Sequence, residues 1–198
     1  MRVTIIGTGN MARGIGSRVL AGGHHLTVVG KDSGRAEAVA ADIGGDGTVK
    51  TAVAGDPIEG EVVVLAVYYP DARAAAQQYT DQLVGEIVVD ITNPVNESLD
   101  GLVVPPDGSV TEELAALAGA ARWVKAFNTA FAGPLTSGEV AGHKLDVLIA
   151  GDDKGAKRKV SQLISDGGLR PLDADWSGRP TADEQDGQEE IGAFTPVE

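Results

Sequence analysis

A glycine-rich motif near the start of the chain constrains its fold more than any other feature. Residues 2–6 form a short apolar run that leads directly into the pattern G-x-G-x-x-A, which reads Gly7-Thr8-Gly9-Asn10-Met11-Ala12. In such a turn the first glycine permits a tight exit from a strand and the second leaves room beside the backbone. The alanine then lets the next helix pack closely. Because a helix N-terminus offers free N–H groups to phosphates, the motif predicts a pyrophosphate-binding turn.

The segments around the motif fit this interpretation. An amphipathic helix is predicted over residues 11–21, and a second strand over residues 26–29, which ends in Gly30. A strand, a glycine turn, a helix and a second strand in this order are typical of a nucleotide-binding Rossmann unit. The alternative is a structural strand-to-helix turn that binds no ligand.

The end of the second strand bears on which dinucleotide binds. Sites for NAD usually place an Asp or Glu there, which binds the ribose 2′-hydroxyl and would repel the 2′-phosphate of NADP. This chain has Gly30 at that point, and Lys31, Ser33 and Arg35 follow. The glycine leaves space, and the two cations and the hydroxyl can bind a phosphate. We therefore expect NADP(H).

Asp32 is the residue of this segment that argues against NADP(H). Its simpler interpretation is a cap, or a first-turn charge, for the helix predicted over residues 34–43. Lys31 and Arg35 also have a simpler interpretation, as solvated surface residues without a ligand.

Composition excludes several classes of partner and site. The chain has 198 residues, enough to bury a sizeable core, and no cysteine, which excludes disulfides and thiolate metal sites. Of its three histidines, His24 and His25 lie in one predicted turn, so we expect no metal site. The net charge of −13 argues against nucleic acid and anionic membranes as partners. Without a leader or an apolar span, a cytoplasmic location is expected.

The negative charge is concentrated at the C-terminus. From Asp173 onward the chain has eight acidic residues and one basic residue, Arg179. Residues 177–198 hold too few apolar side chains to offset the entropy of ordering them. We therefore expect a dinucleotide-binding domain over residues 1–176 and a flexible acidic tail over residues 177–198.

Strands and helices alternate along the rest of the chain. This alternation indicates an α/β fold of Rossmann type, a doubly wound and mainly parallel sheet with helices on both faces. Further strands are predicted at residues 48–51, 62–66, 87–90, 123–126, 145–150 and 169–172. Further helices are predicted at residues 70–83, 109–117 and 152–165. Ser109 and Glu112 have the spacing of a capping box for the second of these helices.

Three strand ends are expected to face the nicotinamide end of the dinucleotide. Ligands of open α/β sheets bind beyond the carboxyl ends of the strands, and the ends in question are residues 66–69, 91–95 and 127–130. Their side chains are small, apolar or amide-bearing and include no acid/base pair. We therefore expect no catalytic side chain at these strand ends.

Together these motifs resemble the family of F420-dependent NADP oxidoreductases over residues 1 to about 176. The matching segments are the glycine motif and residues 30–32, 65–68, 90–94, 124–129 and 168–174. The family transfers a hydride between the deazaflavin coenzyme F420 and NADP. The resemblance therefore implies both cofactors for this chain.

The resemblance also implies roles for individual residues. At the glycine turn that begins with Gly7, the pyrophosphate would be held by Thr8, Gly9, Asn10 and Met11. The 2′-phosphate would be held by Lys31, Ser33 and Arg35. The nicotinamide ribose would be lined by Val67, Tyr68, Asn93 and Pro94, and the second cofactor would be faced by Phe127, Asn128 and Thr129.

The C-terminus departs from the family's pattern. Family members usually continue after the last strand into apolar helices that complete the deazaflavin pocket and often the dimer interface, whereas residues 177–187 are polar here. Three functions therefore stay open: hydride transfer between NADP(H) and F420, NADPH-dependent reduction of a flavin or another small acceptor, and NADPH binding without turnover. A homodimer also stays open.

Overall fold

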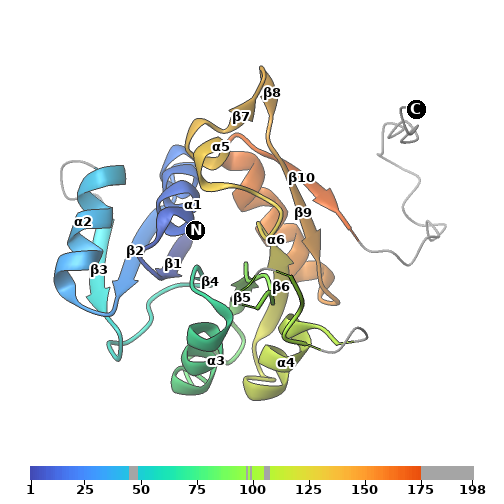
Figure 1. Ribbon diagram of the computed structural model, residues 1–198. Coiled ribbons are helices and arrows are strands. Elements are labelled where there is room, and N and C mark those ends of the chain that lie inside the picture. Colours follow the sequence, from blue (N-terminus) through green and yellow to red (C-terminus); the bar gives the residue numbers. More distant parts are fainter. Residues whose placement is uncertain (45–48, 97, 99, 105–107, 175–198) are drawn as a thin grey trace, which may run out of the picture.

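The structure is built around an eight-stranded sheet, and runs of β-branched residues form several of its strands (Figure 1). The computed structural model describes residues 1–44, 49–96, 98, 100–104 and 108–174. The strands of this sheet are β1 (Arg2–Ile6), β2 (His25–Gly30), β3 (Val49–Val53), β4 (Val62–Leu65), β5 (Ile87–Asp90), β6 (Arg122–Ala126), β9 (Asp146–Ala150) and β10 (Arg170–Asp173). The acidic tail expected at residues 177–198 lies outside the described residues, as does Thr48, the start of the predicted third strand.

The strand order is β10-β9-β6-β5-β4-β1-β2-β3. Neighbouring strands from β3 to β6 are parallel, β9 runs antiparallel to β6, and β10 is parallel to β9. The prediction of a mainly parallel Rossmann-type sheet is thus confirmed. The strand order reverses at β1, which lies between β2 and β4, and α/β sheets bind ligands at such a switch point.

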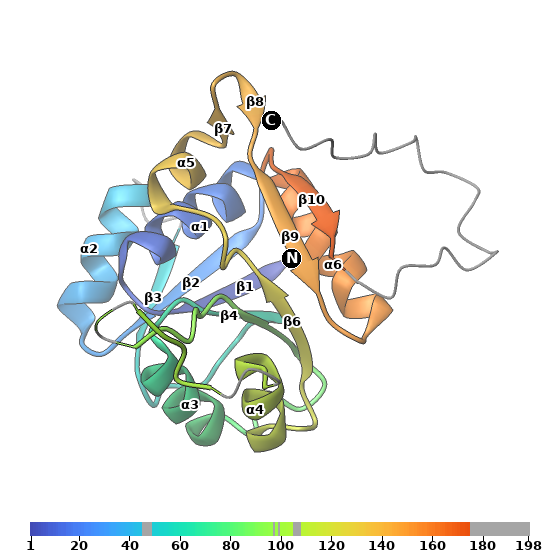
Figure 2. The same cartoon turned by 45° about the vertical axis from the view of Figure 1, so that its right-hand side comes forward.

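Helices cover both faces of the sheet (Figure 2). One face packs against α1 (Asn10–Ala21), α2 (Ser33–Gly44), α5 (Ala132–Ser137) and α6 (Lys154–Asp166), and the other against α3 (Tyr69–Gln78) and α4 (Val110–Leu117). Alternation along β4 shows why both faces are apolar, because Val64 packs with the first group of helices and Val63 and Leu65 with the second. No helix within the described ranges is long and apolar enough to span a membrane.

Helix α3 ends at Gln78, five residues before its predicted end at Leu83. Tyr79 is 1% exposed and accepts a hydrogen bond from the Gly55 amide at 2.7 Å, which ties this point of the chain to the loop after β3. Leu83 is also buried, but it reaches the core from a turn rather than from the helix. The helix is therefore shorter than predicted because the chain turns at Tyr79.

The start of α4 corrects a second prediction. Ser109 is the N-cap residue, as expected, but its side chain makes no capping hydrogen bond, so the capping box with Glu112 does not form. Instead, two side chains of the first turn form hydrogen bonds with residues outside the helix. Thr111 donates a hydrogen bond to Asp90 at 2.7 Å, and Glu113 accepts one from the Tyr69 hydroxyl.

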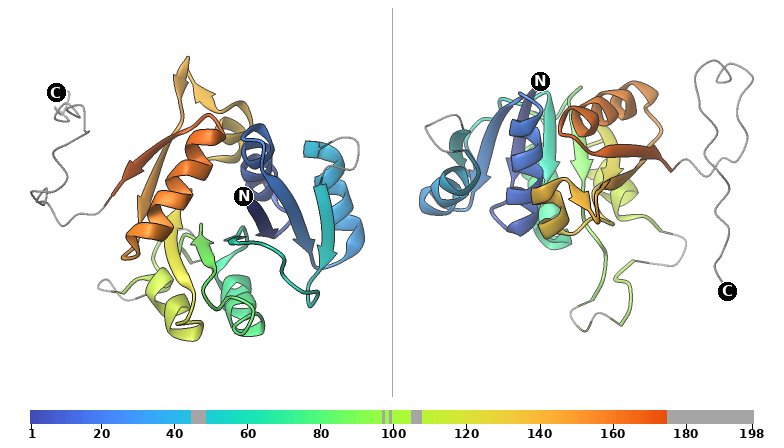
Figure 3. Two further views of the ribbon diagram at one scale, coloured as in Figure 1. Left: turned by 180° about the vertical axis from the view of Figure 1, so that it is seen from behind. Right: turned by 90° about the horizontal axis from the view of Figure 1, so that it is seen from above.

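A short helix and a hairpin between β6 and β9 are absent from the predicted elements. They are α5 and the antiparallel pair β7 (Glu139–Val140) and β8 (His143–Lys144). The hairpin projects from one end of the molecule, and α6 covers β9 and β10 on the rear face (Figure 3). Helix α5 contains Gly133 and Pro134, which are poor helix formers, and Leu135 is fully buried against the core shared with α1.

Candidate nucleotide-binding site

The glycine turn lies at the switch point of the sheet. Gly7 has a φ of +129°, and a Cβ at this position would lie 2.2 Å from the carbonyl oxygen of Ala66 at the end of β4. Its amide donates a hydrogen bond to the carbonyl of Val29 in β2 at 2.9 Å. Only glycine fits where the ends of these three adjacent strands come together, as the sequence motif predicts.

Gly9 shows the opposite environment. It is the N-cap of α1 with an extended backbone, and a Cβ at this position would meet no atom within 4 Å. The first turn of α1 contains no acidic residue. Arg13 steadies the turn by donating to the carbonyl of Thr8 at 2.7 Å and to the Asp42 carboxylate at 2.7 Å. The N-terminus of a twelve-residue helix therefore faces open space, and this arrangement fits a dinucleotide pyrophosphate.

The end of β2 carries cations that already have partners. Lys31 Nζ lies 3.2 Å from both carboxylate oxygens of Asp71 in α3, and Arg35 Nε lies 3.2 Å from Asp32 Oδ2. The Lys31 and Arg35 side chains are 67% and 66% exposed, so both are accessible to a ligand. Ser33 begins α2 between them and is also exposed.

Asp32 has the capping role that its position suggests. Its Oδ1 accepts a hydrogen bond from the Arg35 amide at 2.9 Å, in the first turn of α2, while Oδ2 faces the guanidinium of the same residue. Both oxygens are therefore engaged with the helix and its arginine. This is the capping role, which needs no ligand, and the Asp32 side chain is 58% exposed.

A buried polar network lies at the ends of β5 and β6 and was not predicted from the sequence. Asp90 is fully buried, and its Oδ2 lies 2.8 Å from Lys125 Nζ and 2.7 Å from Thr111 Oγ1. Its Oδ1 accepts from the amide of Thr92 at 2.8 Å, and Lys125 also donates to the carbonyl of Thr92. The available signal was an aspartate that ends an otherwise apolar strand and a lysine in the next strand.

This network fixes the loop that follows β5. Asn93 Nδ2 donates to the carbonyl of Asn128 at 2.8 Å, which joins the loops after β5 and β6. Because β4, β5 and β6 are parallel to β1, all these loops lie at the same edge of the sheet as the glycine turn. Val67 and Pro94 are half-buried there. The structure thus brings together the strand ends that were expected to face the nicotinamide.

Two aromatic residues at this edge differ sharply in exposure. Tyr68 is 87% exposed, so its ring is accessible to a ligand. Phe127 is only 3% exposed and packs in the core, with a left-handed φ of 62°. Little of its surface is therefore available to a second cofactor, although the family resemblance implies that Phe127 faces one. Asn128 is half-buried and Thr129 is exposed, so their side chains can still do so.

Two ionisable side chains at this edge, Tyr69 and Lys125, are held by neighbouring residues. Tyr69, next to Tyr68, donates its hydroxyl to Glu113, and this hydrogen bond raises the pKa of Tyr69 and keeps the phenol protonated. Lys125 is held by Asp90 and Thr92, as described above. Among the described residues, no group of three or more His, Cys, Asp or Glu side chains could hold a metal ion.

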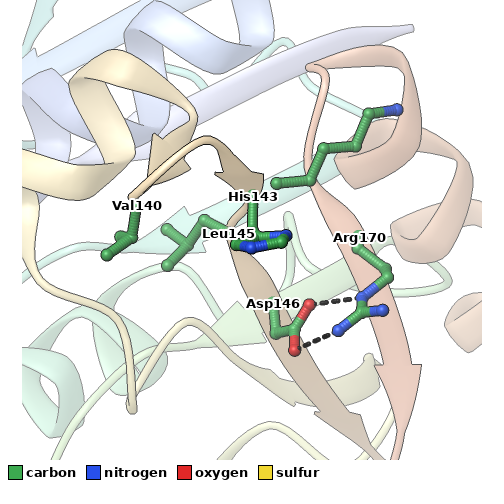
Figure 4. A pocket seen from close by; sticks show the side chains of 6 residues that line it. Val140, His143, Leu145, Asp146 and Arg170 are labelled. Carbon is green, nitrogen blue, oxygen red and sulfur yellow. Dashed lines mark hydrogen bonds and ion pairs between the residues drawn. The ribbon is translucent and has the colours of Figure 1, made fainter.

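An open pocket elsewhere contains none of the predicted site residues (Figure 4). It lies between the β7–β8 hairpin and the starts of β9 and β10. Its lining residues are Val140, His143, Lys144, Leu145, Asp146 and Arg170. A two-point ion pair between Arg170 and Asp146 crosses it at 2.5 and 2.6 Å, and the hydrogen bond from the guanidinium lowers the pKa of Asp146.

Comparison with known proteins agrees with the geometry at the glycine turn. Residues 2–94 match the family model described as NADP oxidoreductase, coenzyme F420-dependent. These residues contain the glycine turn, the cations after β2 and the loops after β4 and β5. Phe127, Asn128 and Thr129 lie beyond the matched segment.

Two curated relatives match this chain, one over most of its length and the other over little more than half. Metalloreductase STEAP3 of Rattus norvegicus is 31% identical over 172 residues, which covers 87% of this chain and 33% of that protein. The F420-dependent NADP reductase of Methanocaldococcus jannaschii is 31% identical over 120 residues, which covers 58% of this chain and 53% of that protein. The chain thus spans about a third of the first relative and about half of the second.

A solved structure extends the similarity to the whole described fold. A protein from Arthrobacter sp. FB24, proposed to be an F420-dependent NADP-reductase, has a TM-score of 0.75 and 26% sequence identity. The match covers 87% of this chain and 83% of that chain. The segment that matches the model of the coenzyme F420-dependent NADP oxidoreductases, residues 2–94, thus lies within a fold that is similar to that structure over 87% of this chain.

Proposed function

We propose that this protein is an NADP(H)-dependent oxidoreductase that transfers a hydride between NADP(H) and the deazaflavin coenzyme F420. The observation that carries the proposal is the open N-terminus of α1 at the switch point, where a Cβ at Gly9 would meet no atom within 4 Å. A dinucleotide pyrophosphate fits this space. Lys31 directly follows β2 and Arg35 lies in the first turn of α2, near the point where the 2′-phosphate of NADP is expected.

The protein's own contribution to such a reaction is positioning. When bound, NADPH supplies the hydride, so the chain needs neither a nucleophile nor a metal. The Asn93–Asn128 hydrogen bond and the Asp90–Lys125 pair fix the loops that would hold the reacting rings in place. Such fixed geometry at about 3–3.5 Å between reacting atoms is the main source of catalysis in a reaction of this kind.

A second candidate is an NADPH-dependent reductase with a flavin or another small acceptor in place of F420. The match that favours it is the metalloreductase, which aligns with 87% of this chain, against 58% for the F420-dependent reductase. The two candidates share the NADPH site at the glycine turn. They differ in what binds at the loops after β5 and β6.

An acceptor assay separates the candidates. NADPH oxidation is followed by absorbance with F420, with FMN or FAD, and without an acceptor. The leading proposal requires turnover with F420 that exceeds turnover with either flavin, and the second candidate requires the reverse order. Tight NADPH binding without oxidation in any arm would reject both in favour of a non-catalytic NADPH-binding protein. The Gly9→Val variant is the control, because it is expected to lose all turnover.

A further inference from the structure

The Lys31–Asp71 ion pair lies across the proposed dinucleotide site. Lys31 follows the last residue of β2, and Asp71 lies in the first turn of α3, which follows β4. In the sheet, β1 separates these two strands. The pair therefore links the two sides of the glycine turn, at the edge where the proposed ligand binds.

We propose that Asp71 is a specificity-determining residue that competes with the 2′-phosphate of NADP(H) for Lys31. This inference rests on the proposed function and concerns only the nucleotide half of the site. In the free protein, the Asp71 carboxylate neutralises the ammonium group of Lys31 at 3.2 Å from both oxygens. A 2′-phosphate at the same ammonium displaces this carboxylate and is repelled by it.

The other ion pair at this end of β2 differs in a way that singles out Asp71. Asp32 also faces a cation, Arg35, but its second oxygen caps α2 through the Arg35 amide. Removal of Asp32 therefore changes the helix as well as the charge. Asp71 contacts Lys31 through both oxygens and is 46% exposed, so it can turn away into solvent when a phosphate arrives.

The expected effect is a gain of affinity on removal of an acidic residue. Asp71→Asn frees Lys31 and removes the repulsion, so NADPH binds about two- to fivefold more tightly, the range for an exposed ion pair. NADH has no 2′-phosphate, and its affinity stays within error of the wild-type value. The ratio of NADPH to NADH affinity therefore rises by the same factor.

Calorimetric titration of the full chain with NADPH and with NADH tests the proposal. Asp81→Asn is the matched control, because it removes one exposed acidic charge just beyond the other end of α3. Between Asp71 and Asp81 lie the rest of the helix after Asp71, about 10 Å along its axis, and the turn that follows Gln78. This variant leaves both affinities unchanged if the effect is local, and raises NADPH affinity equally if only net charge matters.

A double variant tests whether Asp71 acts through Lys31. In a Lys31→Met background, the gain from Asp71→Asn shrinks, because the cation for which the carboxylate competes is gone. An unchanged or weaker NADPH affinity in Asp71→Asn would overturn the inference. If the wild-type protein bound neither nucleotide, the proposed function itself would fail, and this result is distinct from a failure of the inference.

Discussion

The two sides of the proposed site use charge in opposite ways. After β2, Lys31 and Arg35 lie in exposed ion pairs with Asp71 and Asp32. After β5 and β6, the Asp90 carboxylate is fully buried with Lys125. Exposed pairs contribute about 0–1 kcal/mol, whereas breaking a buried pair costs about 3–5 kcal/mol. One side therefore keeps its cations free to exchange partners with a ligand, and the other uses the same chemistry to fix a loop.

The buried pair gives the largest expected effect. Lys125→Met leaves the Asp90 carboxylate buried without its cation and should lower the free energy of unfolding by about 3–5 kcal/mol. Lys31→Met makes the same substitution on the exposed side and should change it by less than about 1 kcal/mol. Chemical denaturation of both variants measures the difference. Equal losses of unfolding free energy in the two variants would show that the buried pair and the exposed pair do not differ in their contribution to stability.

Gly9→Val separates binding from stability at the glycine turn. Its backbone is extended and its Cβ position is open, so the free energy of unfolding should stay nearly unchanged. The valine would occupy the space for the pyrophosphate, so affinity for NADPH and NADH should fall by at least about 100-fold, or 2.7 kcal/mol. Near wild-type NADPH affinity in a folded variant would mean that the turn is structural only.

Arg35→Ala tests the exposed side by nucleotide affinity. Loss of a hydrogen bond to a charged group should weaken NADPH binding by about 1–3 kcal/mol and leave NADH binding nearly unchanged. Lys50→Ala is the matched control, since Lys50 is an exposed cation in an ion pair with Glu59, near the start of β3 and away from the site. A similar loss of NADPH affinity in both variants would point to net charge rather than to a phosphate site.

The smallest effect is expected at the ion pair between Asp153 and Arg122, whose side chains are 40% and 34% exposed. The hydrogen bond from the Arg122 guanidinium holds the pKa of Asp153 far below its usual value. A depressed pKa adds stability that is fully present above the unfolded-state pKa and is lost as pH falls toward the folded-state value. The free energy of unfolding at pH 7 should therefore be higher for the wild-type protein than for Asp153→Asn. The difference between the two proteins should become smaller below about pH 4. A gap that is constant with pH would exclude this charge effect.

The fold could be predicted largely because its signals are local. The glycine turn, the β-branched strands and the alternation with helices all appear within short stretches of sequence, and the structure confirms them. Asp32 was also interpretable from its position before a helix. Helix α5 was not, because residues such as Gly133 and Pro134 disfavour a helix that depends on contacts with α1.

The polar contacts of the site could not be predicted from sequence patterns. Asp90 and Lys125 are 35 residues apart, and Lys31 and Asp71 are 40 apart, so each pair depends on the register of strands. The burial of Phe127, which has a left-handed backbone directly after β6, could not be predicted from the sequence either. Such contacts arise only once the sheet has formed.

The ratio of NADPH to NADH affinity in the wild-type protein tests both parts of the proposed nucleotide site at once. We propose that the open N-terminus of α1 binds a dinucleotide and that Lys31 and Arg35 bind the 2′-phosphate. Calorimetric titration should therefore give a dissociation constant for NADPH at least about tenfold lower than for NADH, which is about 1.4 kcal/mol. Equal dissociation constants, or tighter binding of NADH, would mean that Lys31 and Arg35 do not form a 2′-phosphate site.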